Sequence, residues 1–160
     1  MLNQRMFLLS GFLVILVSAC ATATQNIEGE NWVAFSAETA QKDQMLDWLF
    51  PSDAEYWSPT AADIRALESA LPAYLQENRS AFYMTETLIW KRLDEYNRQY
   101  IGVVLGGKKI IYASFLCQGG ANTEWKEHFI LVADGGACYF QFKYEPSTGG
   151  YYDLSVNGEA

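Results

Sequence analysis

The chain has 160 residues, 50% of them hydrophobic, and a formal net charge of −8. This acidic balance argues against nucleic acid and against an anionic membrane face as partners, because both select basic patches. A chain of this length usually forms one domain and buries roughly two-thirds of the surface that its unfolded form exposes. The composition therefore predicts one compact body and no nucleic acid partner.

The first twenty residues hold an apolar run that ends in small residues and a cysteine. One positive charge, Arg5, precedes the run 6–17, and Cys20 closes the segment. A membrane-spanning helix needs about 20 apolar residues, whereas the hydrophobic part of a signal peptide needs roughly 7–15. The run has the second length, so residues 1–19 are expected to be a cleaved signal peptide.

The tetrad Val17-Ser18-Ala19-Cys20 resembles the lipobox of bacterial lipoproteins, with valine where leucine is more usual. In that family a peptidase cuts before the cysteine, whose thiol carries a diacylglyceryl group. A thiol is the nucleophilic side chain of this stretch, and each buried methylene of an acyl chain contributes about 0.8 kcal/mol to anchoring. An uncleaved membrane anchor and an ordinary signal peptide are the alternatives.

The resemblance implies lipidation at Cys20, a membrane partner through the N-terminal lipid, and a place in the cell envelope. Ala21, rather than aspartate, follows the cysteine. In the lipoprotein family this implies the outer membrane, facing the periplasm, if the host is Gram-negative. Removal of residues 1–19 would take away one positive charge and leave a net charge of about −9.

Residues 20–57 are expected to form the lipidated tether and an aromatic strap. Residues 21–31 lack hydrophobic periodicity, and a short helix is expected over 36–50, with Ser36 as its N-cap. Residues 48–59 combine aromatic side chains with two prolines, which favours neither a long helix nor a strand. We interpret them as a strap lying on the domain with its rings at least partly buried. These rings are Trp48, Phe50, Tyr56 and Trp57.

The clearest helix pattern starts at Thr60, which has the capping-box spacing to Asp63. Apolar residues then recur at i, i+3 and i+7 and one turn further, which makes one amphipathic face. They are Ile64, Leu67, Leu71 and Leu75. Pro72 lacks an amide proton and clashes with the preceding turn, so a kink or a restart of the helix is expected near Leu71.

From Gln99 onward the apolar period changes to two, which is typical of strands. Gly106-Gly107 is expected to turn one hairpin, 134–136 a second, and 151–158 to supply a last strand. A helix followed by such strands predicts an α+β fold. We expect an N-terminal helix or helices packed on one face of a mostly antiparallel sheet of about four to five strands, in a single domain over 58–160.

Cys117 and Cys138 form an even pair in a compartment that permits disulfides. In a simple meander they would lie at opposite ends of the sheet, and cysteines with Cα atoms more than about 7 Å apart cannot bridge. A bridge is nevertheless predicted, because the loop after Cys117 is long enough to relocate the next strand.

Three short motifs resemble those of a loosely defined group of uncharacterised bacterial secreted proteins and lipoproteins. They are RQY at 98–100, DGGACYF at 134–140 and VNGEA at 156–160. The resemblance covers roughly residues 58–160 and implies no activity. It supports the domain boundary and the cysteine pair.

His128 is the only histidine and follows Glu124 and Glu127. A general base or a zinc site needs further partners, and no second histidine exists to complete a usual zinc set. Carboxylate pairs, such as Asp53 with Glu55, are expected by chance in an acidic chain. No catalytic residue, metal site or cofactor is predicted.

Glycine pairs account for two further motifs. Asp134-Gly135-Gly136 has the composition that a tight turn needs, because glycine adopts positive φ without steric cost. Gly106-Gly107-Lys108-Lys109 lacks the spacing of a phosphate-binding loop. Both are interpreted as turns.

Four tyrosines fall on the less apolar strand faces by alternation: Tyr100, Tyr112, Tyr139 and Tyr151. Such rings are suited to bind a glycan, a peptide or a partner protein. The alternative is that a helix or the strap covers this face as well.

The sequence therefore predicts a lipid-anchored cell-envelope protein, most simply a non-catalytic binding module for an envelope protein or a glycan. One alternative is an envelope hydrolase that uses carboxylates with or without His128. Another is a structural or inhibitory lipoprotein without a small-molecule site. The open face of the sheet distinguishes the three.

Overall fold

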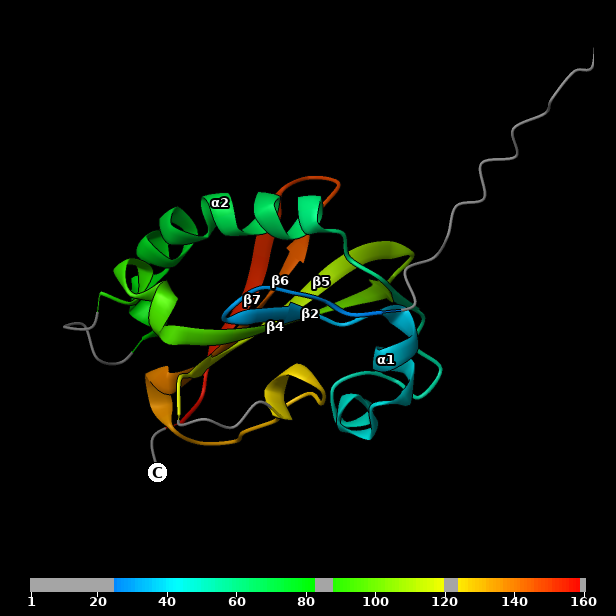
Figure 1. The fold of residues 1–160 in the computed structure, drawn as a ribbon. Helices are drawn as coiled ribbons and strands as arrows, with labels where there is room; N and C mark the ends of the chain where they lie inside the picture. Colours follow the sequence, from blue (N-terminus) through cyan, green and yellow to red (C-terminus); the bar gives the residue numbers. More distant parts are fainter. Residues whose placement is uncertain (1–24, 83–87, 120–123, 159–160) are drawn as a thin grey trace, which may run out of the picture.

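The computed structural model describes residues 25–82, 88–119 and 124–158. Within these ranges the chain forms a seven-stranded, mostly antiparallel sheet, and one long helix, α2 (Ala61–Glu77), lies across one face (Figure 1). The predicted α+β class is confirmed. The sheet is larger than the four to five strands expected, and strands precede α2 in the chain.

The strands follow the order β1-β2-β4-β5-β6-β7, and β3 pairs with β4 outside this path. Neighbouring strands are antiparallel except for β2 and β4, which are parallel. The strands are β1 (Ile27–Glu28), β2 (Trp32–Ala34), β3 (Tyr56–Trp57), β4 (Tyr96–Leu105), β5 (Lys108–Cys117), β6 (Tyr139–Glu145) and β7 (Gly150–Val156).

Short helices fill the connections. Besides α2 there is a shorter α-helix, α1 (Ala37–Lys42), within the described residues. Its N-cap is Ser36, whose hydroxyl accepts a hydrogen bond from the Thr39 amide. The 3₁₀ helices are η1 (Gln44–Trp48), η2 (Arg79–Ala81), η3 (Ile89–Lys91), η4 (Leu93–Glu95), η5 (Glu124–Lys126) and η6 (Gly136–Cys138). The single helix expected over 36–50 is therefore two short helices, because Asp43 ends α1 and its side chain caps η1.

Residues 27–57 contribute strands to the sheet, where the sequence suggested only a tether and a strap lying on the domain. β2 pairs with the middle of β4, and β3 pairs with the same strand further along. Side chains of this segment are buried in the core: Val33, Phe35, Ala40, Leu46 and Phe50. The domain boundary therefore lies upstream of residue 58.

Helix α2 follows its sequence pattern. The Asp63 carboxylate accepts a hydrogen bond from the Thr60 amide at 2.8 Å, and the Thr60 hydroxyl accepts one from the Asp63 amide at 3.3 Å. The four apolar residues of the predicted face are each at most 2% exposed. Pro72 lies inside one continuous helix, so the expected restart is wrong, and the helix axis curves toward its C-terminal end (Figure 1).

The first predicted hairpin is confirmed and the second is wrong. Gly106 and Gly107, with φ of 57° and 78°, join β4 to β5 in a two-residue turn that requires positive φ. A hairpin turned at 134–136 needs a strand directly before the turn, but residues 129–133 form no strand. The segment with Trp125 and Phe129 instead crosses the face of the sheet opposite α2, and β6 pairs directly with β5.

A bulge reverses part of the alternation in the last strand. The β6–β7 register shifts between Gln141 and Lys143, and Asp153 on β7 has a φ of 54°. Tyr151 lies opposite Tyr144 on the α2 face, and Leu154 packs against the same core after the bulge. Tyr151 therefore faces inward, the reverse of the sequence-based expectation.

The sheet has a core on each face. On the α2 face the helix packs on β4–β7, and rings of Phe115 and Phe140 stack with centroids 4.6 Å apart. On the second face, α1, η1 and the segment with Trp125 and Phe129 cover β4 and β5. The side chains on both faces of β4 and β5 are consequently mostly buried.

The sulfur atoms of Cys117 and Cys138 lie at disulfide distance, and their Cα atoms are 4.8 Å apart. This geometry is compatible with the predicted bridge. The objection from a simple meander does not apply, because Cys117 ends β5 and Cys138 directly precedes the neighbouring strand β6.

Replacing both cysteines by serine should lower the free energy of unfolding by about 3 kcal/mol, because the bridge closes a loop with a sequence separation of 21. Denaturant unfolding of the oxidised protein and the double variant measures the difference. Alkylation of the non-reduced wild type, followed by mass spectrometry, provides the control. Modification of both thiols would contradict the bridge.

Candidate binding groove at the disulfide end of the sheet

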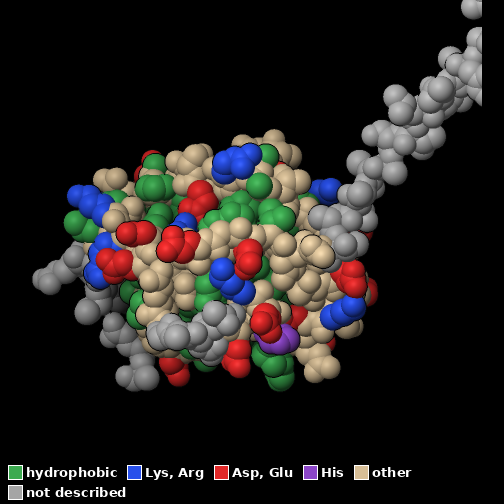
Figure 2. Space-filling model, viewed as in Figure 1, with side chains coloured by type: hydrophobic (Ala, Val, Ile, Leu, Met, Phe, Trp, Pro, Cys, Tyr) green, Lys and Arg blue, Asp and Glu red, His purple; other side chains and the backbone are tan. Residues whose placement is uncertain are grey.

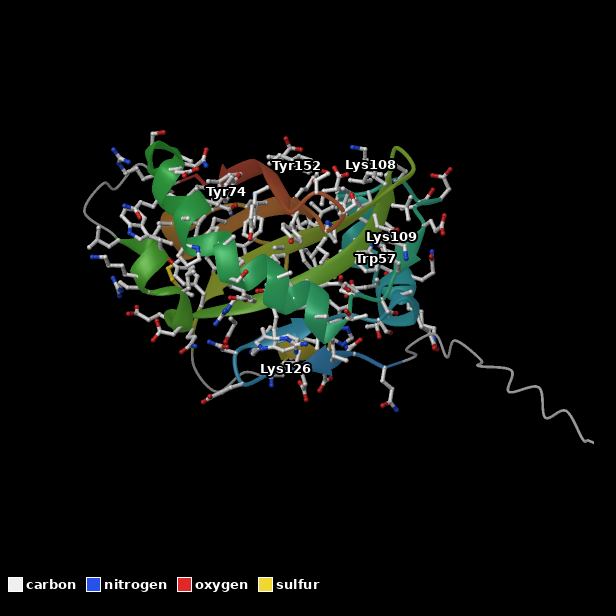
Figure 3. The ribbon with its side chains drawn as sticks, turned by 90° about the horizontal axis from the view of Figure 1, so that it is seen from above. Trp57, Tyr74, Lys108, Lys109, Lys126 and Tyr152 are labelled. Atoms are coloured by element: carbon white, nitrogen blue, oxygen red, sulfur yellow. A yellow bond between two sulfur atoms is a disulfide. The ribbon has the colours of Figure 1, made fainter. Side chains whose placement is uncertain are left out.

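The four predicted tyrosines do not share one open face. Tyr100 is 0% exposed under α2, and Tyr112 is 9% exposed in the core of the second face. Tyr151 stacks on Tyr74, with ring centroids 4.8 Å apart, and its hydroxyl donates to the Leu67 carbonyl. Figure 3 shows Tyr74 reaching from α2 toward β6 and β7. Only Tyr139 lines an open groove.

The second face of the sheet is only partly covered. The overlying segments cover β4 and β5, but on β6 and β7 the side chains of this face are half-buried or exposed. They are Gln141, Lys143, Tyr152 and Ser155. The Lys143 ammonium lies 2.9 Å from an Asp153 carboxylate oxygen and 6.0 Å from the centre of the Tyr152 ring. This polar surface extends from the outer strands toward Tyr139.

A groove of about 210 Å³ adjoins this surface, between the sheet and the described segment that includes Trp125 and Ile130. Most of its lining is aromatic or aliphatic, with the disulfide at one side. The lining residues are Asn97, Leu116, Cys117, Gly119, Trp125, Ile130 and Tyr139. The combination of apolar walls with few polar groups is typical of small-ligand sites, although this groove is smaller than most.

Two polar side chains of the groove are available to a ligand. The Asn97 carboxamide and the Tyr139 hydroxyl make no side-chain hydrogen bond to any residue within the described ranges. An amide donates and accepts, and a phenol does the same. The groove therefore offers two hydrogen-bonding groups beside aromatic rings.

Gln99 fixes the wall of the groove from within the sheet. Its side chain is fully buried, its amide donates to the Trp125 and His128 carbonyls, and its carbonyl accepts from the Ile130 amide at 2.9 Å. Within 129–133 this side chain is the partner of the Ile130 amide, where a strand would have had a backbone partner. The middle residue of the RQY motif thus holds the crossing segment in place.

The C-terminal motif holds the far part of the same segment. The Asn157 amide donates to the Val132 carbonyl at 2.5 Å and to the Asp134 carbonyl at 3.3 Å. Asp134 also forms a parallel bridge with Gly158. The Tyr96 hydroxyl donates to the Ala137 carbonyl at 2.9 Å. One residue of each motif, namely Gln99, Asp134 and Asn157, therefore takes part in contacts that hold this segment, which neither composition nor periodicity indicates.

Position 135 requires glycine for two reasons, its backbone conformation and the closeness of the Tyr139 ring. Its φ is 102°, and a Cβ atom placed there would lie 2.6 Å from the Tyr139 ring. The ring thus rests directly on the glycine backbone. The positive φ of Gly135 and Gly136 agrees with the expected need for glycine here, but these residues lead into η6 and position the groove rather than closing a hairpin.

The predicted histidine lies in a different pocket. His128 is exposed and lines a depression of about 220 Å³ with Glu38, Lys42, Asp43 and Glu127, and Figure 2 shows it beside acidic side chains. Glu38 pairs with Lys42 at 2.7 Å, which lowers the pKa of the glutamate. This pairing ties one carboxylate of the pocket to its own helix.

Asp43 is also committed to the fold. One carboxylate oxygen accepts from the Met45 amide at 3.0 Å, and the other accepts from the Phe129 amide at 2.6 Å. A group that holds two backbone amides is poorly suited to move protons. The pocket therefore lacks a free pair of carboxylates beside His128.

Within the described ranges, no group of three or more histidine, cysteine or acidic side chains is placed to hold a metal ion. None of the helices in these ranges is long and apolar enough to cross a membrane. Lipidation at Cys20 lies outside the described residues. Comparisons with protein-family models, with curated proteins and with solved structures find no match.

Proposed function

We propose that this protein is a lipid-anchored envelope protein that binds a cell-wall glycan or a partner protein through the groove beside the disulfide. The observation that carries the proposal is the pair of available polar groups, Asn97 and Tyr139, among aromatic and aliphatic walls. Aromatic rings combined with amide groups suit the alternating apolar and hydroxyl surfaces of a sugar. The groove volume of about 210 Å³ fits one sugar ring or one side chain.

The anchor is proposed from the lipobox resemblance. Lipidation of Cys20 would hold the protein at the membrane, and Ala21 would direct it to the outer membrane, facing the periplasm, in a Gram-negative host. Two or more acyl chains suffice for stable anchoring. A binding domain on such an anchor links its ligand to the membrane surface.

Replacing Cys20 by serine should abolish acylation, because serine lacks the thiolate that accepts the lipid. The mass of the mature wild-type protein, compared with that of the variant, measures this directly. Cys117→Ser is the matched control, since it removes a cysteine outside the lipobox. Acylation of the Cys20→Ser variant would contradict the anchor.

Replacing Asn97 by alanine should weaken binding to purified peptidoglycan sacculi by about tenfold, the cost of one lost hydrogen bond at a buried site. Co-sedimentation of the intact protein with sacculi measures the affinity. Gln76→Ala is the matched control, because Gln76 is exposed on α2, on the other side of the sheet. Equal binding by both variants would exclude the groove as a glycan site and favour the partner protein.

The hydrolase remains the competing proposal, with Glu127 and His128 as its remaining polar groups. Release of soluble fragments from the same sacculi, abolished by His128→Gln, would favour it over binding alone. Retention of release in that variant would exclude a role for the histidine.

A further inference from the structure

The 3₁₀ helix η1 exposes two large apolar side chains. Trp48 is 79% exposed and Met45 is 43% exposed, whereas Leu46 between them is 1% exposed. Side chains at i and i+3 of a 3₁₀ helix lie above one another, so Met45 and Trp48 point in the same direction. The other rings of the predicted strap, Phe50 among them, are buried or half-buried. Trp48 is the exception to that prediction.

The element that presents these side chains is firmly held. Asp43 caps η1 through the Met45 amide and also accepts a hydrogen bond from the Phe129 amide. This second bond ties η1 to the segment that covers the second face of the sheet. Leu46 within η1 and Phe50 shortly after it are both buried in the core of the second face. The exposure of Trp48 is therefore a fixed property of the fold. A single exposed apolar residue needs no explanation, but an aligned pair on a held element marks a contact surface.

This pair lies at the end of the molecule where the described chain begins. The Asn26 carboxamide oxygen accepts from the Ser36 amide at 2.9 Å, and Ser36 begins α1. Six residues of α1 and five of η1 then lead to Trp48, a path of about 20 Å at ordinary helical rises. Figures 1 and 3 both place the first described residues beside the end that holds α1.

The chain between Cys20 and this end is short. Residues 21–25 span at most about 18 Å when fully extended. A domain of this size has a radius of gyration of about 14 Å and hence a diameter of about 36 Å. A lipid on Cys20 would therefore keep the α1 end within reach of the bilayer. In Figure 1 the end of the sheet where β5 ends and η6 lies is opposite the end that holds α1, so the disulfide between these elements would face away from the bilayer.

We propose that Met45 and Trp48 dock on the membrane that holds the lipid of Cys20, as a second contact that orients the domain. This inference rests on the proposed lipidation. Tryptophan favours the interfacial layer of a bilayer, where its ring is buried and its N–H stays hydrated.

The charges around η1 define the kind of membrane surface. Acidic Asp47 lies between Met45 and Trp48 in the helix, and Glu38 is paired with Lys42 nearby. This surface does not attract anionic lipid, in agreement with the acidic composition. The surface that fits is therefore zwitterionic. Docking in this orientation presents the groove to the envelope rather than to the lipid.

Quenching by brominated lipid tests the contact. The intact acylated protein is reconstituted in vesicles of phosphatidylethanolamine and phosphatidylcholine, with or without bromine on the upper part of the acyl chains. The difference in tryptophan emission between wild type and Trp48→Phe reports on Trp48. We expect brominated lipid to reduce this difference at least about twofold. Trp90→Phe is the control, because half-buried Trp90 lies in η3 near the disulfide. The difference in emission between wild type and this variant should be the same with and without brominated lipid.

The outcomes separate the contact from the anchor. Acylated protein with unquenched Trp48 would overturn the docking and leave the proposed lipoprotein function intact. Equal quenching of Trp48 and Trp90 would also overturn it, since no orientation would remain. A mature protein without acyl chains would overturn both. If Trp48 were unquenched in vesicles but shielded from solvent in isolated envelopes, the docking on lipid would be overturned. Met45 and Trp48 would then contact a partner protein instead.

Discussion

Replacing Glu68 by alanine should lower the free energy of unfolding by about 4 kcal/mol, within the range for breaking a buried ion pair. The Arg98 guanidinium lies 2.7 Å from both Glu68 carboxylate oxygens, and the Arg98 side chain is only 11% exposed. The Tyr100 hydroxyl donates to the same carboxylate. Removal of Glu68 leaves a buried cation and a buried hydroxyl without their partner, which is the costly case.

The protonation of Tyr100 supports this account. Burial, and then the Glu68 carboxylate, raise the pKa of Tyr100 well above its ordinary value. The phenol therefore stays protonated and keeps donating to Glu68. Glu68, Arg98 and Tyr100 thus join α2 to β4, through the first and last residues of the RQY motif.

Denaturant unfolding of purified variants measures the effect. Glu77→Ala is the matched control, because Glu77 is exposed in the last turn of the same helix, and its loss should change stability by less than about 0.5 kcal/mol. Glu68→Gln keeps a hydrogen-bond acceptor and should fall between the two. A loss below 1 kcal/mol for Glu68→Ala would show that the ion pair contributes little beyond its desolvation.

Replacing Gly102 by alanine should destabilise the fold by about as much, about 4 kcal/mol, because overpacking here breaks a strand pair as well. A Cβ atom at Gly102 would lie 2.2 Å from the Trp57 carbonyl oxygen and 2.9 Å from its ring. The oxygen belongs to the backbone of β3, so only separation of β3 from β4 relieves the contact. The Trp57 ring would then lose its hydrogen bond to the Ile110 carbonyl, 3.2 Å long.

Figure 3 shows Trp57 beside Lys109, whose ammonium lies 5.0 Å from the ring centre. Displacement of this ring should therefore also change its fluorescence, which gives a second measurement besides unfolding. Gly119→Ala is the matched control, since the nearest atom to its Cβ position is the Cys117 carbonyl oxygen at 3.9 Å. Equal stability of the two variants would contradict the close approach of β3 to β4.

Local signals in the sequence were sufficient where the interaction partners are close in the chain. The capping box at Thr60 and Asp63 predicts the start of α2, and the Gly106-Gly107 pair predicts the β4–β5 turn. These features depend on φ preferences and on hydrogen bonds within a few residues. The buried face of α2 follows from helical periodicity in the same way.

Distant contacts decided the rest of the sheet. β1 and β2 have only two and three residues, too few for a periodic pattern. They enter the sheet because β4 offers backbone partners to β2, and β2 in turn offers them to β1. Residues 129–133 look like a strand, but their backbone groups find partners in the side chains of Asp43, Gln99 and Asn157. A strand pattern indicates that backbone groups need partners, but the pattern does not identify those partners.

The candidate site shows the same division most clearly. By itself, the sequence determined the fold class, helix α2, the β4–β5 hairpin, and the presence of two cysteines suited to pair. The tertiary structure alone decided that both faces of β4 are buried, that the Asp153 bulge turns Tyr151 inward, and that Tyr139 lines a groove while Trp48 stays exposed. Alternation separates two faces of a strand, but whether either face meets solvent depends on which segments fold back over it, and those contacts are fixed only by the packing of the whole domain.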